Sequence, residues 1–465
     1  MRKLIFTTLV LLGLTLTAHA AQPKYVFYFI GDGMGLGHVL SAETYNRTVL
    51  GNKEHLTMLQ FPVATVCTSY SASSKITDSA AAGTALSTGT KTRNYMLGMG
   101  PDTVACYSIA KHLKDNGYGV AIATSVPIDD ATPGAFYTHV KNRKLFYEIG
   151  LDLAKSGYDF FAGTMLRGRK DSEGKENDLM KTIKKNGYTV SFGADEYNKV
   201  RGKKHPKMLL LSAENGKGHN GFTIDSVAGD LKLEFITSAC IEHLQKYSPD
   251  KFFVMVEGGN IDWAAHANDG GTVVKEILNF DKSIALAYEF YKQHPDETLI
   301  VVTADHNTGG MALGVKKGPH EVDLSVFDYQ RTSLESFQSY CIELQKSGKS
   351  ITWEEMKEIL SAKLGLFGAV KVSEKREKAL QESFNRTFVT HNGGDEQTLY
   401  ATFSEFVKEV FDVQNHCAGI GWTSYSHTGD FTPVYAVGAG AEAFSGLRDN
   451  TDLPKIILEL TGVKK

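Results

Sequence analysis

The sequence predicts an α/β protein, a three-layer αβα sandwich built around a mainly parallel central sheet. Three stretches repeat one order of elements, an amphipathic helix followed by a turn and an apolar strand; they span residues 108–125, 226–259 and 273–306. An earlier apolar run at 24–35 ends in a glycine-rich turn, as a buried strand does. Helices that alternate with apolar strands are typical of a parallel sheet covered on both faces.

The bulk properties are those of a globular protein and exclude some partners. Hydrophobic residues make up 42% of the 465 positions and charged residues 22%, the balance of an ordinary soluble chain. The formal net charge is only −3, so we expect no nucleic-acid-binding surface. None of the five cysteines forms a CxxC pair, which excludes a zinc knuckle or a thioredoxin motif.

The first 20 residues have the pattern of a secretory signal peptide. Arg2 and Lys3 precede an apolar run that ends in Ala18-His19-Ala20, a small-x-small cleavage site. No cysteine follows the cut, and no later apolar run is long enough to span a bilayer. We therefore expect an exported mature chain of residues 21–465 with no membrane anchor, which in a Gram-negative bacterium would be periplasmic.

Residues from about 308 to 420 interrupt the alternation of helices and strands. The patterns at 335–364 and 396–413 predict amphipathic helices. We expect a helical insertion that caps or flanks the sheet, after which the chain returns to a last strand at 432–440 and a closing helix.

Acidic and histidine side chains follow four of the predicted strands. They are Asp32, Asp129 with Asp130, Glu257, and Asp305 with His306. In open parallel sheets, ligands bind beyond the carboxyl ends of the strands, so four such ends predict one shared site. Zinc binds histidine nitrogen and carboxylate oxygen, whereas magnesium prefers oxygen.

A further pair of metal-type residues lies on one helical turn. Asp262 and His266 are four residues apart, so they face the same side of a helix and suit one cation. Taken alone, this spacing is more often a solvated helix face, and its weight comes from the acidic strand ends around it.

Ser79 stands at the start of a predicted helix, between Asp78 and the run AAAGTALSTG. Free N–H groups and the helix dipole favour an anion there. One interpretation is that Ser79 caps the helix, because Ser and Asp are both good N-caps. The other is that Ser79 is a nucleophile activated by a nearby metal.

Six motifs resemble those of the alkaline phosphatases, and they occur in that family's order from Tyr28 to Asp430. They are YFIGDGMG, KITDSAAAGTALSTGTKT, DDATPGAFYTHVKNR, EGGNIDWAAHAND, TADHNTGG and SHTGD. The resemblance covers nearly the whole mature chain. It implies an exported hydrolase of small-molecule phosphate monoesters, active as a homodimer.

Matched residue by residue, the resemblance also implies a site. It assigns Ser79 as the nucleophile that forms a phosphoserine, Arg143 as the clamp on two phosphate oxygens, and Asp78 as the carboxylate that orients this arginine. It implies two zinc ions and one magnesium ion. The implied ligands are Asp262, His266 and His427 for the first zinc, Asp32, Asp305 and His306 for the second, and Asp32, Thr132 and Glu257 for magnesium, with Asp130 at its edge, directly or through water. Trp263 departs from relatives that carry Lys or His there.

Three other functions use similar residues. A sulfatase would need Cys or Ser in a C/S-x-P-x-R motif, and DSAAAGT lacks that Pro and Arg; a phosphodiesterase usually lacks the arginine clamp. An exported phosphate-binding protein would use the helix start at Ser79 but would not need the metal-type residues around it.

Overall fold

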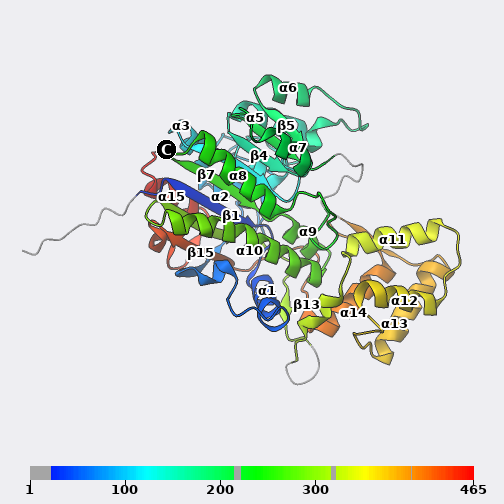
Figure 1. The fold of residues 1–465 in the computed structure, drawn as a ribbon. Helices are drawn as coiled ribbons and strands as arrows, with labels where there is room; N and C mark the ends of the chain where they lie inside the picture. Colours follow the sequence, from blue (N-terminus) through cyan, green and yellow to red (C-terminus); the bar gives the residue numbers. More distant parts are fainter. Residues whose placement is uncertain (1–21, 214–220, 316–320, 400, 465) are drawn as a thin grey trace, which may run out of the picture.

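The protein is built around one ten-stranded sheet (Figure 1). The computed structural model describes residues 22–213, 221–315, 321–399 and 401–464. Across the sheet the strands are β16 (Arg448–Asp449), β2 (Val63–Thr68), β15 (Thr432–Gly438), β8 (Thr298–Ala304), β1 (Tyr25–Gly31), β7 (Phe252–Glu257), β3 (Gly119–Thr124), β4 (Phe160–Gly163), β6 (Met208–Leu211) and β5 (Thr189–Phe192). Only β15 runs antiparallel to its neighbours in this sheet. The predicted mainly parallel α/β fold is confirmed.

Helices cover both faces of the sheet, and its central strands are therefore buried at every position and mostly apolar. Along β1, Phe27 and Phe29 enter one core, and Val26, Tyr28 and Ile30 enter the other. The first core packs against α1 (Leu36–Thr48), α7 (Gly193–Val200), α8 (Leu233–Tyr247), α9 (Asn260–His266) and α10 (Gly270–Gln293). The second packs against α2 (Ser79–Thr88), α3 (Ile109–Asp115), α4 (Ala131–Gly134), α5 (Phe146–Ser156), α6 (Leu179–Lys185) and α15 (Asp452–Leu460).

Four further helices gather at one end of the molecule, drawn in yellow and orange at the right of Figure 1. They are α11 (Leu334–Lys346), α12 (Trp353–Leu364), α13 (Glu374–Phe384) and α14 (Glu405–Ala418). The first two elements after β8 are short strands and do not belong to this group: β9 (Asn307–Thr308) pairs with β14 (His427–Thr428), and β10 (Ala312–Leu313) pairs with β13 (Ile420–Gly421).

One helix boundary predicted in this region was wrong. The helix expected over 396–413 begins only at Glu405, and the residues before it form an antiparallel hairpin of β11 (Asp395–Gln397) and β12 (Thr402–Ser404). The reason is local: the Ser404 hydroxyl accepts the Val407 N–H and caps α14. The residues that precede this cap therefore pair as strands.

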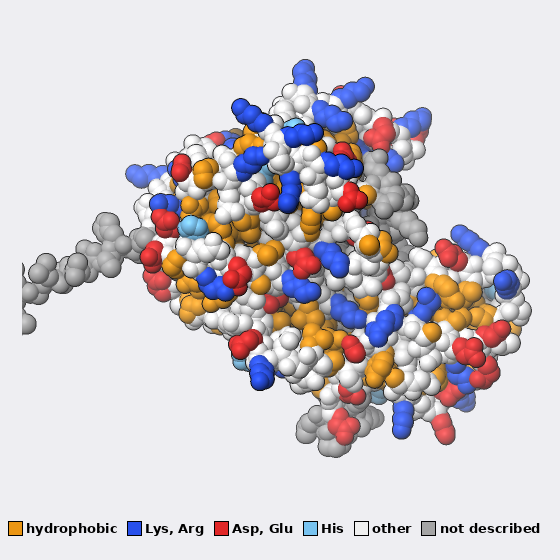
Figure 2. All heavy atoms as spheres, in the orientation of Figure 1, with side chains coloured by type: hydrophobic (Ala, Val, Ile, Leu, Met, Phe, Trp, Pro, Cys, Tyr) orange, Lys and Arg blue, Asp and Glu red, His pale blue; other side chains and the backbone are white. Residues whose placement is uncertain are grey.

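The surface carries both charge signs without a field of one sign on the face drawn in Figure 2, where basic and acidic side chains alternate. In the described residues, none of the helices is long and apolar enough to cross a membrane. The predicted signal peptide, residues 1–20, lies outside the described residues.

Candidate active site

The four strands that end in acidic or histidine residues are neighbours in the sheet, in the order β8, β1, β7 and β3. The register aligns their ends: Gly31 pairs with Ala304, and Glu257 pairs with both Ile30 and Thr124. Side chains that are more than 200 residues apart in the chain therefore meet at one edge of the sheet, as predicted from the strand ends.

Asp78, and not Ser79, caps the helix that follows. Asp78 is the N-cap of α2, and its Oδ1 accepts the Ala81 N–H at 2.9 Å. Ser79 is the first helical residue, fully buried, with its Oγ 3.2 Å from His306 Nε2. The capping interpretation of Ser79 is wrong, because Asp78 already caps the helix and leaves the serine hydroxyl directed at the histidine.

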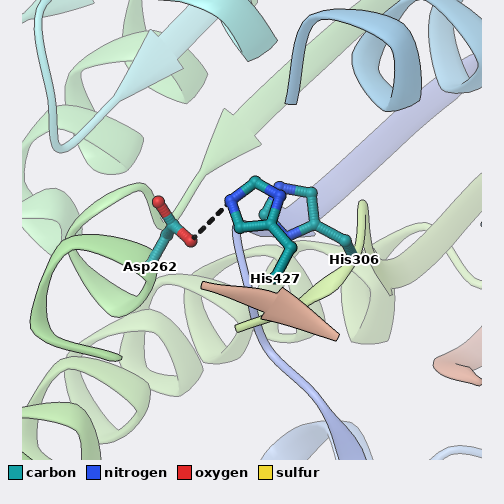
Figure 3. A group of neighbouring side chains, drawn as sticks. All are labelled: Asp262, His306 and His427. Atoms are coloured by element: carbon teal, nitrogen blue, oxygen red, sulfur yellow. Dashed lines mark ion pairs between the residues drawn. The ribbon is translucent and has the colours of Figure 1, made fainter. Parts of the chain in front are cut away.

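Asp262, His266 and His427 form one cluster of donor atoms. Asp262 Oδ1 lies 3.5 Å from His266 Nε2 and 3.8 Å from His427 Nε2, and the two Nε2 atoms are 3.1 Å apart. The pairing of β14 with β9 sets His427 opposite Thr308, two residues after His306. Asp262 and His427 face each other in Figure 3, where His306 lies close behind His427.

Each of the two histidines forms a hydrogen bond through Nδ1, and its Nε2 faces the Nε2 of the other. His266 Nδ1 lies 2.7 Å from the Tyr425 carbonyl, and His427 Nδ1 lies 2.8 Å from the Thr77 carbonyl. Because a carbonyl can only accept, both Nδ1 atoms carry the proton. Burial, and then His306, lower the pKa of His427 to about 3, so it is neutral. Two Nε2 atoms that face each other at 3.1 Å suit a cation between them.

Asp32, Asp305 and His306 form a second cluster beside Ser79. His306 Nε2 lies 3.4 Å from Asp32 Oδ1 and 3.1 Å from Asp305 Oδ2. The two clusters touch, since the rings of His306 and His427 stack with centroids 3.6 Å apart. By proximity of donor atoms, His306 falls in both clusters, grouping with Asp262 and His427 as well.

Both clusters contain buried carboxylate oxygens without a hydrogen-bond partner among the described residues: Asp32 Oδ1, Asp262 Oδ2 and Asp305 Oδ2. Burial raises the pKa of Asp32 well above its ordinary value, and the Asp305 charge adds to this effect. Unpaired buried acids are costly unless a cation compensates them. The donor set therefore fits metal ions, with nitrogen and oxygen in both clusters as zinc prefers.

Gly33 holds the two clusters together from the turn after β1. Its N–H donates to Asp305 Oδ1 at 3.0 Å, and its φ is +68°. A Cβ here would lie 2.7 Å from Thr308 Oγ1 and 2.8 Å from Asp262 Oδ1. The glycine is needed both for its backbone conformation and for the close approach of these side chains.

Glu257, Thr132 and Asp32 lie next to the second cluster but are less tightly grouped. Thr132 Oγ1 donates to Asp32 Oδ2 at 3.5 Å, and Glu257 Oε2 accepts a hydrogen bond from Thr124. Burial raises the pKa of Glu257, and nearby Asp130 and Asp305 raise it further. These are hydroxyl and carboxylate oxygens, the kind of ligand that magnesium prefers.

Asp130 lies among arginines. Its Oδ1 accepts from Arg143 Nη2 at 3.0 Å and its Oδ2 from Arg167 Nη1 at 3.1 Å. Burial alone would raise the pKa of Asp130, but Arg167 and Arg143 bring it below its ordinary value. Arg143 also approaches Asp78 Oδ2, at 3.5 Å. Because both oxygens of Asp130 are engaged, a contact to a nearby ion through water fits this carboxylate better than direct ligation.

Three polar residues of the site were not predicted from the sequence. Thr124 ends β3, and Thr308 donates a hydrogen bond to Asp262 Oδ1. Thr308 is the last residue of β9, so both hydroxyls lie at strand ends, and the rule used for the acids would have found them. Arg167, in the short 3₁₀ turn Arg167–Arg169, has no motif around it, and only its tertiary contacts place it at the site.

A mainly parallel α/β sheet that brings together a buried serine, an arginine and two nitrogen–oxygen donor clusters has the arrangement expected of a metal-dependent hydrolase. The family model for alkaline phosphatase matches residues 23–463. The chain therefore belongs to the alkaline phosphatase family, whose members are metal-dependent phosphomonoesterases.

Relatives match over nearly the whole chain. Alkaline phosphatase 4 of Bacillus subtilis is 28% identical over 446 residues, which cover 95% of this chain and 89% of the relative. Alkaline phosphatase 3 of the same organism is 29% identical over 453 residues, with 94% and 88% covered. The structure of a cold-active alkaline phosphatase from a psychrophilic Shewanella species aligns with a TM-score of 0.78 at 26% identity, over 94% of this chain and 99% of the other.

Proposed function

We propose that the protein is an exported alkaline phosphatase that hydrolyses phosphate monoesters by in-line transfer of the phosphoryl group to Ser79. One observation carries the proposal: Ser79 Oγ is buried at the start of α2, 3.2 Å from a histidine that belongs to both donor clusters. A serine hydroxyl is a weak nucleophile until a base or a metal activates it, and this is the position where a metal would do so.

Two zinc ions and one magnesium ion suit the donor sets. Asp262, His266 and His427 would hold the first zinc, Asp32, Asp305 and His306 the second, and Asp32, Thr132 and Glu257 the magnesium, with Asp130 nearby. Such ions, when bound, lower the pKa of coordinated oxygen nucleophiles and neutralise the charge that develops on oxygen.

The residues of the chain bind the phosphoryl group and accept it. Ser79 Oγ forms a bond to phosphorus while the bond from phosphorus to the ester oxygen breaks, and the alcohol leaves with a proton. Water then cleaves the phosphoserine, which restores the Ser79 hydroxyl and releases inorganic phosphate. The N–H groups at the start of α2 and the planar fork of Arg143 stabilise the equatorial oxygens in both steps.

Asp78 contacts both the start of α2 and Arg143. It caps α2 through Oδ1 and lies 3.5 Å from Arg143 through Oδ2. The helix that carries Ser79 and the arginine that binds phosphate are therefore fixed by one carboxylate, which favours a monoester with free oxygens to clamp over a diester.

Export to the periplasm and a homodimeric state are part of the proposal. They are supported by the signal-like residues 1–20 and by the family resemblance. Size-exclusion chromatography with light scattering on the mature chain tests the dimer, and fractionation of the cells that produce it tests the export.

The decisive experiment compares kcat/KM for an aryl phosphate with that for the matching aryl sulfate and phosphodiester, using protein loaded with zinc and magnesium. We expect the monoester to be preferred, and a preference for sulfate or diester would overturn the assignment. Labelling with substrate phosphate at low pH should trap a phosphoserine in the wild type and not in Ser79→Ala. Ser87→Ala, in the same helix but bonded to the Ala135 carbonyl, is the matched control and should still be labelled. Elemental analysis of the purified protein tests the metals.

A further inference from the structure

Arg167 is a second guanidinium at the site, and it is held in place from three sides. Its Nη1 donates to Asp130 Oδ2 at 3.1 Å, and the guanidinium lies 5.2 Å from the Phe146 ring centroid and 5.5 Å from that of Trp263. Trp263 directly follows Asp262 of the first donor cluster. A cation between two aromatic rings and a carboxylate is well fixed.

The backbone around Arg167 is also anchored. Asp129 accepts the N–H groups of Arg167 and Gly168 at 3.0 and 2.7 Å. A Cβ on Gly168 would lie 2.2 Å from the Phe146 carbonyl oxygen, so this turn packs directly on the start of α5. The side chain of Arg167 is 27% exposed, compared with 12% for Arg143.

The charges explain what Arg167 does for the clamp. Arg143 lies between two carboxylates, Asp78 at 3.5 Å and Asp130 at 3.0 Å. If these three residues stood alone, the two acids would outnumber the arginine and would oppose the approach of a phosphate dianion. Arg167 pairs with the second oxygen of Asp130 and brings the group of four to neutrality.

We infer that Arg167 is a positioning residue for phosphate binding: by holding and neutralising Asp130, it offsets the negative charge that a phosphate dianion would meet beside Arg143. Arg167 thus acts through Asp130 and not by its own contact with the substrate. This inference rests on the proposed phosphomonoesterase function and specifies how the same site gains affinity for a dianion.

The test removes the charge and keeps the aliphatic stem. In Arg167→Met we expect KM for an aryl phosphate, and the Kd of inorganic phosphate measured by calorimetry, to rise about tenfold, the size of a typical coupling between neighbouring charged groups. The kcat should change less than about threefold, and Arg167→Lys should recover most of the loss. Lys170→Met is the control, because it removes the same charge from an exposed position three residues away and should change neither constant.

A second pair of variants separates action through Asp130 from direct contact. In an Asp130→Asn background the Arg167→Met substitution should change the Kd of phosphate by less than about twofold, since no charge is left to neutralise. The same tenfold effect in both backgrounds would overturn the inference, as would an effect confined to substrates with a second anionic group. A loss that Arg167→Lys does not recover, accompanied by a lower Tm, would show a structural role only.

The inference and the proposed function fail in different ways. A wild-type protein that hydrolyses no aryl phosphate would overturn the proposed function. An active wild-type enzyme whose phosphate affinity is the same in Arg167→Met would overturn the role of Arg167 alone.

Discussion

Gly33→Ala is the substitution whose effect the structure specifies most closely, because Gly51 provides a matched control. Both glycines have φ near +68°, which costs a residue with a Cβ about 1–2 kcal/mol. They differ in their surroundings. A Cβ added at Gly51 would have no atom within 4 Å, whereas one added at Gly33 would lie 2.7 Å from Thr308 Oγ1 and 2.8 Å from Asp262 Oδ1.

The magnitudes follow from this difference. Gly51→Ala should lower the free energy of unfolding by about 1–2 kcal/mol through backbone strain and leave activity unchanged. In Gly33→Ala the overlap adds about 1–3 kcal/mol, as overpacking in a core does. It also displaces Asp262, and a shift of catalytic groups by about 1 Å can cost about 100-fold in rate. We therefore expect a loss of about 2–5 kcal/mol and a fall in kcat/KM of about 100-fold.

Two assays check these values, urea denaturation of the zinc- and magnesium-loaded protein and initial rates with an aryl phosphate. Zinc content, measured for each variant, shows whether the first donor cluster still binds its ion. Equal losses of stability and equal activity in the two variants would refute the reasoning, because they would show that the packing around Gly33 tolerates a methyl group.

Three further predictions address other parts of the molecule. Thr124→Val leaves the Glu257 carboxylate without the hydroxyl that donates to it and should destabilise the protein by about 1–3 kcal/mol in urea denaturation; an unchanged midpoint would contradict it. Removal of metal with a chelator should abolish phosphatase activity and lower Tm, because Asp32, Asp262 and Asp305 each have a buried oxygen without a hydrogen bond in the described part of the chain. Zinc with magnesium should restore both, and a chelated protein with an unchanged Tm would argue against these ligands. Burial raises the pKa of Glu276 from 4.5 to about 7. Between these pH values the folded state therefore binds a proton that the unfolded state does not, so stability falls as pH rises from about 4.5 to 7. The Glu276→Gln variant should lack about 3 kcal/mol of this decline. Denaturation midpoints of both proteins at pH 5 and 8 measure this, and parallel pH profiles would refute it.

The fold could be predicted from the sequence because its main signals are local. Each central strand is buried on both faces and is therefore mostly apolar, and each crossover helix stands next to its strand in the chain. The start of α14 was missed because the hairpin before it depends on pairing between residues 395–397 and 402–404. The amphipathic pattern of residues 396–413 does not indicate that pairing.

The candidate site was predictable to the extent that its residues follow strand ends. Asp32, Glu257, Asp305 and His306 share this position, and adjacent strands in the sheet bring them together. The cap of α2 needed the structure, since Asp78 and Ser79 are both good capping residues and only coordinates show which of them accepts the Ala81 N–H. Arg167 was beyond prediction because nothing near it in the sequence marks it.

The pair Asp78-Ser79 shows why both residue types are needed in this order. A serine at the N-cap would turn its hydroxyl oxygen to the N–H groups of the helix and would use it there. With an aspartate as cap, the N–H of Ala81 is satisfied one residue earlier, and Ser79 Oγ is left at 3.2 Å from His306 Nε2. The Ser79 hydroxyl is thereby left beside the start of α2, as its proposed role as nucleophile requires. The small side chains of the alanines that follow are buried and allow α2 to lie close to α4. A Cβ on Gly83 would come within 3.2 Å of Ala135 and Thr132. Close packing of these two helices therefore sets the position of Ser79 relative to the acids at the ends of β1 and β8.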